Sequence, residues 1–380
     1  MTVLDELIQE LCPDGVKYKA LGEICKLVTG ATPSKTNAAY WENGTIPWMS
    51  SGEVNLKRVA ATEKKITQLG YEKNSTTIVP KHSVVIALAG QGKTRGKAAI
   101  TEIELCTNQS LCSMICNENL DYKFLYYILD GKYEELRAIS NGDGTRGGLS
   151  LKILAPYKIP VPPLPVQREI VHILDNFTEL TAELTAELTA RKQQYAYYRD
   201  KLLAFGDDVP KDTLENLCDF QYGKGNSIPT ALGEYPVYGC NGVIGTTNVF
   251  NSIDAPVIGH IGSAGIVNWG KGKHFVTYNG TICKVRPEKM ISRYAYHLLC
   301  SLHLERFVKG SQPFLSYSDF AEETVAVPPL NIQQRVVSIL DRFDTLCTDL
   351  SSGLPAEIEA RQKQYEYYRD KLLTFGERFN

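Results

Sequence analysis

The stretch PPLPVQREIVHILDNF at residues 162–177 returns at residues 328–343 as PPLNIQQRVVSILDRF. A second pair follows at residues 191–206 and 361–376, where RKQQYAYYRDKLLAFG returns as RQKQYEYYRDKLLTFG. The first pair is offset by 166 residues (328 − 162) and the second by 170 (361 − 191), so the second copy holds four extra residues between its two parts. A duplication of this length indicates that the chain is built from two related halves.

Each copy has the pattern of a long helix. Two prolines stand at the start, apolar residues recur at spacings of three and four, and Gly206 or Gly376 stands where the helix should end. In the first copy the pattern predicts a helix from about Val166 to about Phe205, roughly 60 Å long at about 1.5 Å per residue. Gly353 interrupts the second copy together with a proline two residues later, and we expect a break there that absorbs the extra residues.

The alternating three-four register is typical of coiled coils, so we expect the two copies to pair as an antiparallel coiled coil around a pseudo-twofold axis. The alternative is a single long helix buried in one large core. In the first copy the side chains predicted for the helix pair are Leu174, Phe177, Leu184, Leu188, Tyr195, Tyr198, Leu202 and Phe205. In the second copy they are Leu340, Phe343, Tyr365, Tyr368, Leu372 and Phe375.

The segments that precede the helices are related more weakly. Three positions return 193 residues later, as Leu214, Cys218 and Gly223 for Leu21, Cys25 and Gly30. Short β-branched runs such as SVVIAL, glycine-rich turns and few helical patterns predict mixed sheets with peripheral helices, a mixed α+β class. The predicted order is an N-terminal segment (1–20), a first globule (21–161), a central helix (162–206), a second globule (207–327) and a C-terminal helix (328–380).

The overall composition is that of a soluble globular protein. The chain has 380 residues, and its 41 basic and 43 acidic side chains give a net charge of −2, which argues against a histone-like nucleic-acid binder. No apolar run approaches the ~18 residues that span a bilayer, so we expect a cytoplasmic protein without membrane contact. Ten scattered cysteines without a CxxC pair predict reduced, buried thiols.

A glycine-rich loop carries the sharpest chemical signal. Between Lys73 and Thr101 there are five cations and no acidic residue, and ALAGQGKT at 87–94 meets the permissive form of the P-loop pattern, which would indicate an NTPase. Against this, Ala87 replaces the leading glycine, Gly96 stands where the first helical turn should form, and the second globule has IGSAGIV without a lysine. Such a loop also suits close contact with phosphates. A mobile surface turn with solvated lysines remains the plainer interpretation.

Catalytic signals are missing elsewhere. No Asn-Pro-Pro-aromatic or Asp-Pro-Pro-aromatic motif of adenine methyltransferases occurs, and the six histidines show no metal-ligand spacing. We expect a binding protein with no metal site and no reaction of its own.

Several motifs together resemble the specificity subunit of type I restriction-modification enzymes. These are the VPPL before each helix, followed by Gln167 or Gln333, the paired YYRDKLL ends and the TAEL tetrapeptides at 181–188. Three further stretches are similar to segments of the target recognition domains of that family: GATP at 30–33, the tryptophan-bearing YW and IPW at 40–48, and PVYGCNG at 236–242.

The resemblance implies a non-catalytic, DNA-reading subunit whose two globules are target recognition domains. Its implied partners are double-stranded DNA, two methyltransferase subunits and nuclease-translocase subunits. Those partner subunits would hold S-adenosylmethionine, ATP and Mg, with no cofactor in this chain. The residues then expected to contact DNA are Lys35, Lys93, Thr94, Arg95, Lys97 and Arg146 in the first globule, and Lys224, Lys271, Lys273 and Gln312 in the second.

An antiparallel helix pair would hold the globules apart. Two diverged globules should then read an asymmetric, bipartite target whose spacer is set by the helices. Two alternatives remain open: a coiled-coil adaptor whose globules bind protein or carbohydrate, and an NTPase that uses the loop at 87–94. Salt-dependent binding to duplex DNA would support only the first interpretation.

Overall fold

A computed structural model describes residues 2–90, 94–140, 148–225, 232–348 and 353–378. The chain divides into two compact units, which we call unit 1 (Met1–Ala182 with Glu359–Asn380) and unit 2 (Glu183–Ile358). Each unit combines one globule with parts of the long helices. The division therefore passes through the helices and not between them.

The first repeat copy is one continuous helix, α7 (Leu164–Leu203), of 40 residues, close to the predicted bounds. The second copy forms two helices, α10 (Leu330–Thr348) and α11 (Leu354–Leu372). The expected break is confirmed, since α11 begins directly after Gly353.

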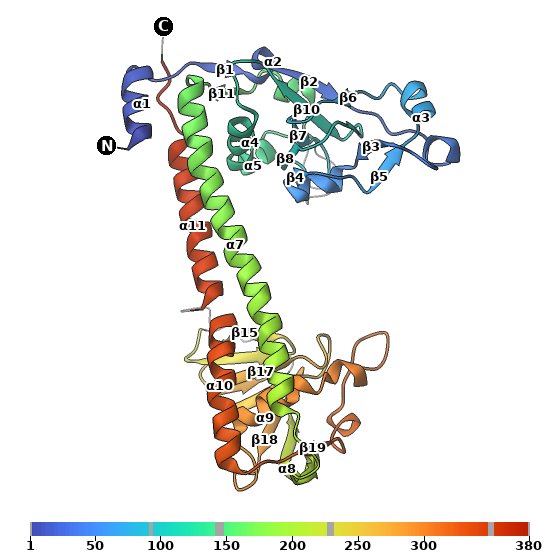
Figure 1. Cartoon of the computed structure of the whole chain (residues 1–380), viewed down its shortest axis with the longest axis vertical. Coiled ribbons are helices and arrows are strands. Elements are labelled where there is room, and N and C mark those ends of the chain that lie inside the picture. The colour runs from blue at the N-terminus through green and yellow to red at the C-terminus, as the bar shows by residue number, and fades with distance from the viewer. Residues whose placement is uncertain (1, 91–93, 141–147, 226–231, 349–352, 379–380) are drawn as a thin grey trace. The chain divides into compact units, whose positions relative to one another are not determined.

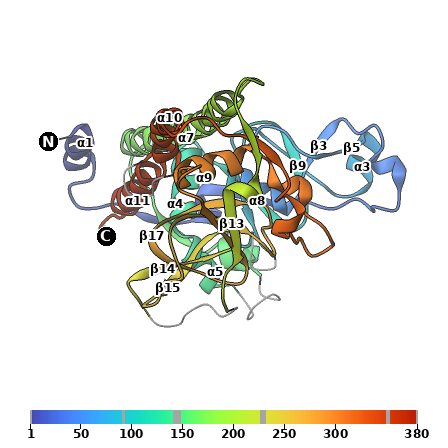
Figure 2. The same cartoon turned by 90° about the horizontal axis from the view of Figure 1, so that it is seen from below.

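An equivalent aromatic pair joins the long helices in each unit. In unit 1, Phe177 of α7 stacks on Tyr368 of α11 with ring centroids 5.5 Å apart. In unit 2, Phe343 of α10 stacks on Tyr198 of α7 at 5.7 Å. The same two repeat positions meet both times with exchanged helices, as a pseudo-twofold arrangement requires. α11 runs beside the first part of α7 in the opposite direction, and α10 lies beside its last part (Figures 1 and 2), so the antiparallel coiled coil is confirmed.

Unit 1 contains a five-stranded sheet of order β2-β10-β7-β8-β4 and a four-stranded sheet of order β5-β3-β9-β6 (Figure 1). The strands of the first sheet are β2 (Cys25–Thr29), β10 (Leu111–Cys116), β7 (Val84–Ala87), β8 (Ala98–Thr101) and β4 (Arg58–Val59). Those of the second sheet are β5 (Lys64–Ile66), β3 (Ile46–Met49), β9 (Leu105–Thr107) and β6 (Ile78–Val79). A short pair joins β1 (Tyr18–Ala20) to β11 (Lys158–Pro160). The helices of the globule are α1 (Val3–Leu11), α2 (Leu21–Ile24), α3 (Gln68–Lys73), α4 (Tyr122–Gly131), α5 (Tyr133–Ala138) and α6 (Leu151–Leu154).

Unit 2 contains a six-stranded sheet of order β13-β18-β16-β17-β14-β15, with the β14–β15 hairpin at its edge (Figure 2). Its strands are β13 (Cys218–Tyr222), β18 (Gly280–Val285), β16 (Ser252–Gly259), β17 (Val267–Val276), β14 (Tyr235–Gly239) and β15 (Gly242–Thr247). A short pair joins β12 (Lys211–Thr213) to β19 (Thr324–Ala326), and the helices of the globule are α8 (Leu214–Leu217) and α9 (Ser292–Ser301).

The two globules share one topology. The order β2-β10-β7-β8 matches β13-β18-β16-β17, and in each globule one further strand adds in parallel, β3 to β9 and β14 to β17. α4 and α9 pack on the equivalent strands and bury Phe124 and Tyr294 at related positions. β7, with the sequence VVIA, is buried along its whole length, as a strand covered on both faces requires. All ten cysteines are unpaired thiols, and seven are buried, as predicted.

A buried glutamine ties each long helix to its globule. Gln167 donates through Nε2 to the carbonyls of Asn119 (2.9 Å) and Pro162 (2.7 Å), and its Oε1 accepts from the N–H of Asp121 (2.8 Å). Gln333 makes the three equivalent hydrogen bonds, to the carbonyls of Lys289 (2.9 Å) and Pro328 (2.8 Å) and from the N–H of Ile291 (2.9 Å). Both glutamines are fully buried. An amide side chain is needed here because the position must donate twice and accept once.

The two described chain ends meet in unit 1. The N–H of Val16 donates to the carbonyl of Gly376 (2.9 Å), and the N–H of Arg378 donates back to Val16 (3.0 Å). The hydroxyl of Tyr18 also donates to the carbonyl of Phe375 at 3.0 Å. Unit 1 is therefore completed by the last residues of the chain, whereas unit 2 is one continuous segment.

Candidate nucleic-acid interface

Several loops of unit 1 gather at one end of the five-stranded sheet. β2 and β7 end there, at Thr29 and Ala87, whereas β10 and β8 begin there. The loop that ends at Leu149 joins them, because the N–H of Leu149 donates to the carbonyl of Leu88 at 2.8 Å. We call this end of the main sheet, in either unit, the loop end. The four described residues predicted for DNA contact in the first globule, Lys35, Thr94, Arg95 and Lys97, belong to loops at this end.

Two tryptophans hold the loop that carries Lys35. The indole N–H of Trp48 donates to the carbonyl of Ala31 (2.9 Å), and that of Trp41 donates to Ser34 (3.0 Å). The two rings meet edge to face at 5.1 Å, and Lys35 is exposed. The GATP and tryptophan motifs, which are separate in the sequence, therefore form one structure. Sequence reasoning noticed both motifs and did not predict their contact.

The glycine-rich loop differs from the expectation. Thr94 is buried, and Arg95 is only 7% exposed, so this structure does not present either side chain to a ligand. Lys97 is half-buried and donates through Nζ to Oδ1 of Asn55 at 2.8 Å. Lys93 and Arg146 lie outside the described residues.

The NTPase alternative is wrong in its structural premise. A P-loop leads into a helix whose N-terminus faces the phosphates. Here Gly96 adopts a φ of +84° and the chain enters strand β8 at Ala98. The loop at 87–94 therefore has the sequence pattern without the supporting helix.

The loop end of unit 2 presents a different set of groups. Lys224 is exposed just after β13, where Gly223 packs so closely that an added Cβ would lie 2.1 Å from the carbonyl oxygen of Thr277. Gln312 is exposed on a turn closed by two hydrogen bonds between the backbones of Lys309 and Phe314, of 2.9 and 3.1 Å.

Aromatic rings surround a buried histidine at this loop end. His260 is 1% exposed, its Nδ1 lies 2.6 Å from the carbonyl oxygen of Leu315, and its ring centroid lies 4.3 Å from Tyr222 and 4.8 Å from Phe314. Tyr278 packs at 6.0 Å from Tyr222. The sequence analysis missed this cluster, because its members are far apart in the chain and none belongs to a motif.

Lys271 and Lys273 lie on β17, away from the loop end where Lys224 is found. Lys273 pairs with Ile253 in the β16–β17 ladder, six residues before the loop end at Gly259, which corresponds to roughly 20 Å along the strand. Its Nζ lies over the rings of Phe250 (5.0 Å) and Tyr235 (5.8 Å). The predicted contact residues of unit 2 therefore form two separate groups.

Most residues predicted for the helix pair also pack on a globule. In unit 1 the globular core includes or contacts Leu174, Tyr365, Leu372 and Phe375. In unit 2 it includes or contacts Tyr195, Leu202, Phe205 and Leu340. Leu184 and Leu188 are half-buried. These residues were predicted for the helix pair, and each YYRDKLL end also contributes to a globular core.

A polar junction joins α9 to both long helices of unit 2. The Asp341 carboxylate accepts from Arg293 Nε (2.6 Å) and pairs with His297 Nε2 (2.8 Å), while the hydroxyl of Tyr195 lies 2.8 Å from His297 Nδ1. In unit 1, Asp175 accepts equivalently from Lys123 (2.5 Å) and from the hydroxyl of Tyr127. Both repeats thus fix the globule to the helix through an aspartate at the same repeat position.

Burial lowers the pKa of His297 below its ordinary value of 6.5, against the opposing effect of Asp341, and burial likewise lowers the pKa of His274. The unfolded chain then takes up protons more readily than the folded unit. We expect the free energy of unfolding of unit 2 to be steady above pH 6.5 and to fall as the pH drops below it, by at most about 1.4 kcal/mol per pH unit for each histidine. Urea denaturation at pH 7.5 and about 5.5 measures this, and the double variant His274→Gln, His297→Gln should flatten the response. Stability that rises on acidification would contradict the prediction.

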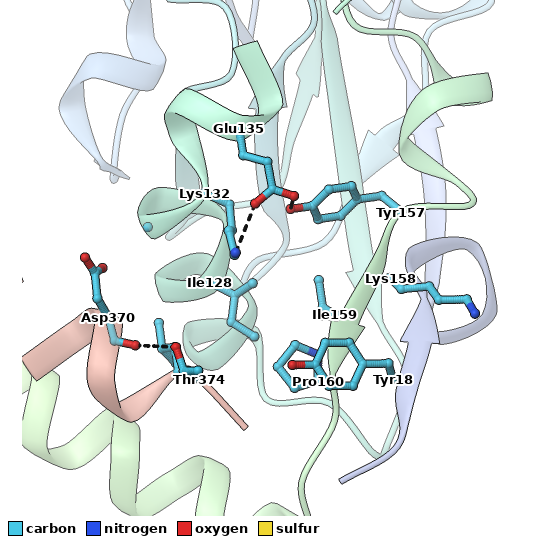
Figure 3. Close-up of a pocket in the computed structure, with 12 residues that line it drawn as sticks. Tyr18, Ile128, Lys132, Glu135, Tyr157, Lys158, Ile159, Pro160, Asp370 and Thr374 are labelled. Carbon is cyan, nitrogen blue, oxygen red and sulfur yellow. Dashed lines mark hydrogen bonds and ion pairs between the residues drawn. The ribbon is translucent and has the colours of Figure 1, made fainter. Parts of the chain in front are cut away.

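A pocket of unit 1 lies beside the β1–β11 pair and the end of α11, away from the loop end (Figure 3). In the figure Lys132 and Tyr157 both point to Glu135. Lys132 Nζ lies 2.9 Å from Glu135 Oε2, and the hydroxyl of Tyr157 donates to Glu135 Oε1 at 2.9 Å. None of the predicted contact residues that the structure describes lines it. The carboxylate of Glu135 is thus already bound by two side chains of the same pocket.

The described residues offer neither a cluster of metal ligands nor a membrane-spanning helix. No group of three or more His, Cys, Asp or Glu side chains is placed to hold a metal ion there. Within the same residues, no helix combines the length and the apolar character needed to cross a membrane.

Comparison with known proteins agrees with this architecture. The type I restriction modification DNA specificity domain matches residues 13–191 and again residues 213–360. The EcoprrI type I restriction enzyme specificity subunit of Escherichia coli is 31% identical over 370 residues, which cover 88% of this chain and 89% of the relative. A putative type I specificity subunit of Mycoplasma pneumoniae is 34% identical over 251 residues, 58% of this chain and 98% of its own length.

The fold also has a solved counterpart. The S subunit of a type I restriction-modification system from M. genitalium has a TM-score of 0.61 at 19% identity, with 94% of this chain and 96% of that chain covered. The double match of the specificity domain follows the same duplication that organises the two units. The chain therefore belongs to the family of type I restriction-modification specificity subunits.

Proposed function

We propose that this chain is the non-catalytic DNA-recognition subunit of a type I restriction-modification complex. The observation that carries the proposal is the duplicated specificity domain, with loops of both copies gathered at one end of equivalent sheets. Residues 21–161 and 207–327 are the two target recognition domains, and each reads one half of an asymmetric, bipartite target. The helix pair sets the spacer between the halves.

The partner subunits are part of this proposal. Two methyltransferase subunits dock on the helices, nuclease-translocase subunits join them, and S-adenosylmethionine, ATP and Mg bind to those partners. The complex acts on chromosomal DNA in the cytoplasm. A coiled-coil adaptor for protein or carbohydrate is less well supported, because the family relationship covers both globules and both parts of the helix repeat.

Single-molecule sequencing of methylated adenines tests the proposal in a host that carries the intact system. The expected result is one asymmetric motif of two specific halves separated by an unspecific spacer. Methylation that is absent, or that follows a palindrome, would overturn it.

The described lysines at the two loop ends, of which Lys35 and Lys224 are exposed and Lys97 is half-buried, should contact DNA phosphates. Replacing Lys35, Lys97 and Lys224 by alanine is expected to weaken binding of all sequences and to reduce the slope of log affinity against log salt by up to about three, roughly one per lost contact. Fluorescence anisotropy over a salt series measures both effects. The double variant Lys271→Ala, Lys273→Ala is the comparison, since those lysines lie in the other group. An unchanged slope in the triple variant would rule out the phosphate contacts.

Two equivalent tyrosines are suited to hold the two methyltransferase subunits. Tyr197 and Tyr367 occupy the same repeat position and are 61% and 62% exposed on α7 and α11. Exposed aromatic side chains are common anchors of protein interfaces. The neighbouring Arg199 and Arg369 are mostly covered and pair with adjacent aspartates at 2.8 Å.

We expect the double variant Tyr197→Ala, Tyr367→Ala to lose the two-to-one complex on native mass spectrometry, whereas each single variant should retain one methyltransferase subunit. Tyr278→Ala, an exposed tyrosine at the loop end, is the matched control and should assemble normally. A double variant that still binds two subunits at wild-type affinity would contradict the assignment.

A further inference from the structure

The aromatic cluster of unit 2 occupies a place where unit 1 has no rings. One backbone hydrogen bond occurs in both units and shows which residues correspond. The N–H of Leu149 donates to the carbonyl of Leu88 (2.8 Å) in unit 1, and the N–H of Leu315 donates to the carbonyl of His260 (2.9 Å) in unit 2. His260 therefore stands where unit 1 has leucine, and Phe314 stands where unit 1 has Gly148.

A second pair of contacts extends the alignment. Gly30 and Gly223 both pack on the carbonyl of a threonine, Thr107 or Thr277. Tyr222, which precedes Gly223, then corresponds to Thr29 of unit 1, and Tyr278, which follows Thr277, corresponds to Asn108. Unit 1 builds the same sheet end without any of these four side chains. The fold does not require them, so they are available for a function specific to unit 2.

The cluster presents three side chains to solvent. Tyr278 is 41% and Phe314 is 39% exposed, and Gln312 is exposed two residues before Phe314 on the same closed turn. The buried ring of His260 supports Phe314 from behind, through a ring contact at 4.8 Å. The turn and its rings are thus held in place before any ligand arrives.

This combination matches the edge of one kind of base pair. In the major groove an A·T pair offers the N6 and N7 atoms of adenine, which a glutamine amide can bind with two hydrogen bonds, and the methyl group of thymine, which takes an apolar contact. Lys224 lies next to Tyr278, whose N–H donates to the carbonyl of Gly225 (2.9 Å), and can reach a flanking phosphate.

We propose that the loop end of unit 2 reads an A·T base pair of one half-site, with Gln312 on the adenine and Phe314, flanked by Tyr278, on the thymine methyl group. This inference rests on the proposed function and adds the residues and the base pair to it. The two halves of the target then differ because the equivalent place in unit 1 has neither a ring nor a glutamine at the aligned positions.

The test uses the chain in complex with its methyltransferase subunits and the target mapped as above. Each thymine of the target is replaced in turn by deoxyuridine, which removes only the methyl group, and each adenine by 7-deazaadenine, which removes the N7 acceptor. At one A·T pair we expect a loss of affinity of about 3- to 10-fold for each change in the wild type. Phe314→Ala should lose a similar factor and become insensitive to deoxyuridine at that pair. Gln312→Ala should become insensitive to 7-deazaadenine at the same pair.

Phe250→Ala is the matched control, since Phe250 is 43% exposed in the same unit but lies in the other group, beside Lys273. It should keep the full deoxyuridine penalty. If Phe314→Ala disturbs folding, Phe314→Leu keeps an apolar side chain and should retain the penalty, while Gln312→Ala on an exposed turn still tests the adenine contact.

The results distinguish a failure of the proposed function from a failure of the base-pair assignment. A wild-type complex that does not prefer its mapped target would overturn the proposed function itself. A complex that prefers its target, but whose deoxyuridine and 7-deazaadenine penalties persist in Phe314→Ala and Gln312→Ala, would overturn only the assignment of these residues.

Discussion

Deletion of residues 185–188 from α7 is expected to shorten the spacer of the DNA target by about one to two base pairs and to leave both half-site sequences unchanged. Four residues are close to one helical turn, so the deletion shifts the remainder of the helix by ~6 Å and rotates it by only ~40°. One base pair occupies ~3.4 Å. The deleted TAEL repeats the TAEL before it, so the half-buried Leu184 would stand directly before Thr189, where Leu188 stands now, and the exposed Glu183 would take the place of Glu187. The helix contacts can therefore re-form.

Mapping methylated adenines in a host with the variant system gives the spacer and the half-sites in one measurement. The matched control is Glu183→Gln with Glu187→Gln, which changes the composition of the same turns and keeps their length. It should leave the spacer as it is. An unchanged spacer after the deletion, or altered half-sites with the old spacer, would show that α7 does not set the distance.

Replacement of Arg293 by alanine is expected to lower the free energy of unfolding of unit 2 by about 3–5 kcal/mol. The guanidinium group binds Asp341 (2.6 Å) and Asp344, and it lies over the rings of Trp269 (4.9 Å) and Tyr296 (4.5 Å). Its removal takes the guanidinium cation from both carboxylates at the junction of α9 with α10.

Urea denaturation followed by circular dichroism measures this loss. Arg306→Ala is the control, because Arg306 also pairs with one carboxylate, Glu323 (2.6 Å), at the surface of the same unit. An exposed pair of this kind contributes ~0–1 kcal/mol. Comparable losses in the two variants would mean that the junction is no stronger than a surface ion pair.

The architecture was predictable where the sequence repeats itself. Helix bounds, the break near Gly353 and the antiparallel pairing all follow from two nearly identical strings at two different offsets. The packing of Tyr195 and Tyr365 into the globules did not follow, because an apolar stripe at a three-four spacing does not say whether a helix or a sheet covers it.

The candidate interface was predictable only in part. The sequence selected Lys35 and Lys224, which the structure places in exposed loops, yet it also selected Arg95, which is buried, and Lys273, which lies far along a strand. Charge in a sequence carries no information on which way a strand points or how deep a side chain lies. The cluster around His260 was missed for the complementary reason, since rings contributed by four separate segments have no common pattern before the chain folds.

The meeting of Val16 with Gly376 has a consequence for the order in which the protein is made. Residues up to Ala182 leave the ribosome first, but unit 1 also needs the segment that starts at Glu359. At roughly 5–20 residues per second, the gap between these two points takes about 10–35 s to translate. During that interval unit 2, a continuous segment, can finish folding while the α7 surface that α11 will cover stays open to water. The first globule to be synthesised is thus the last to be completed, and nascent chains are most exposed to aggregation or to premature capture by partners until α11 has been made.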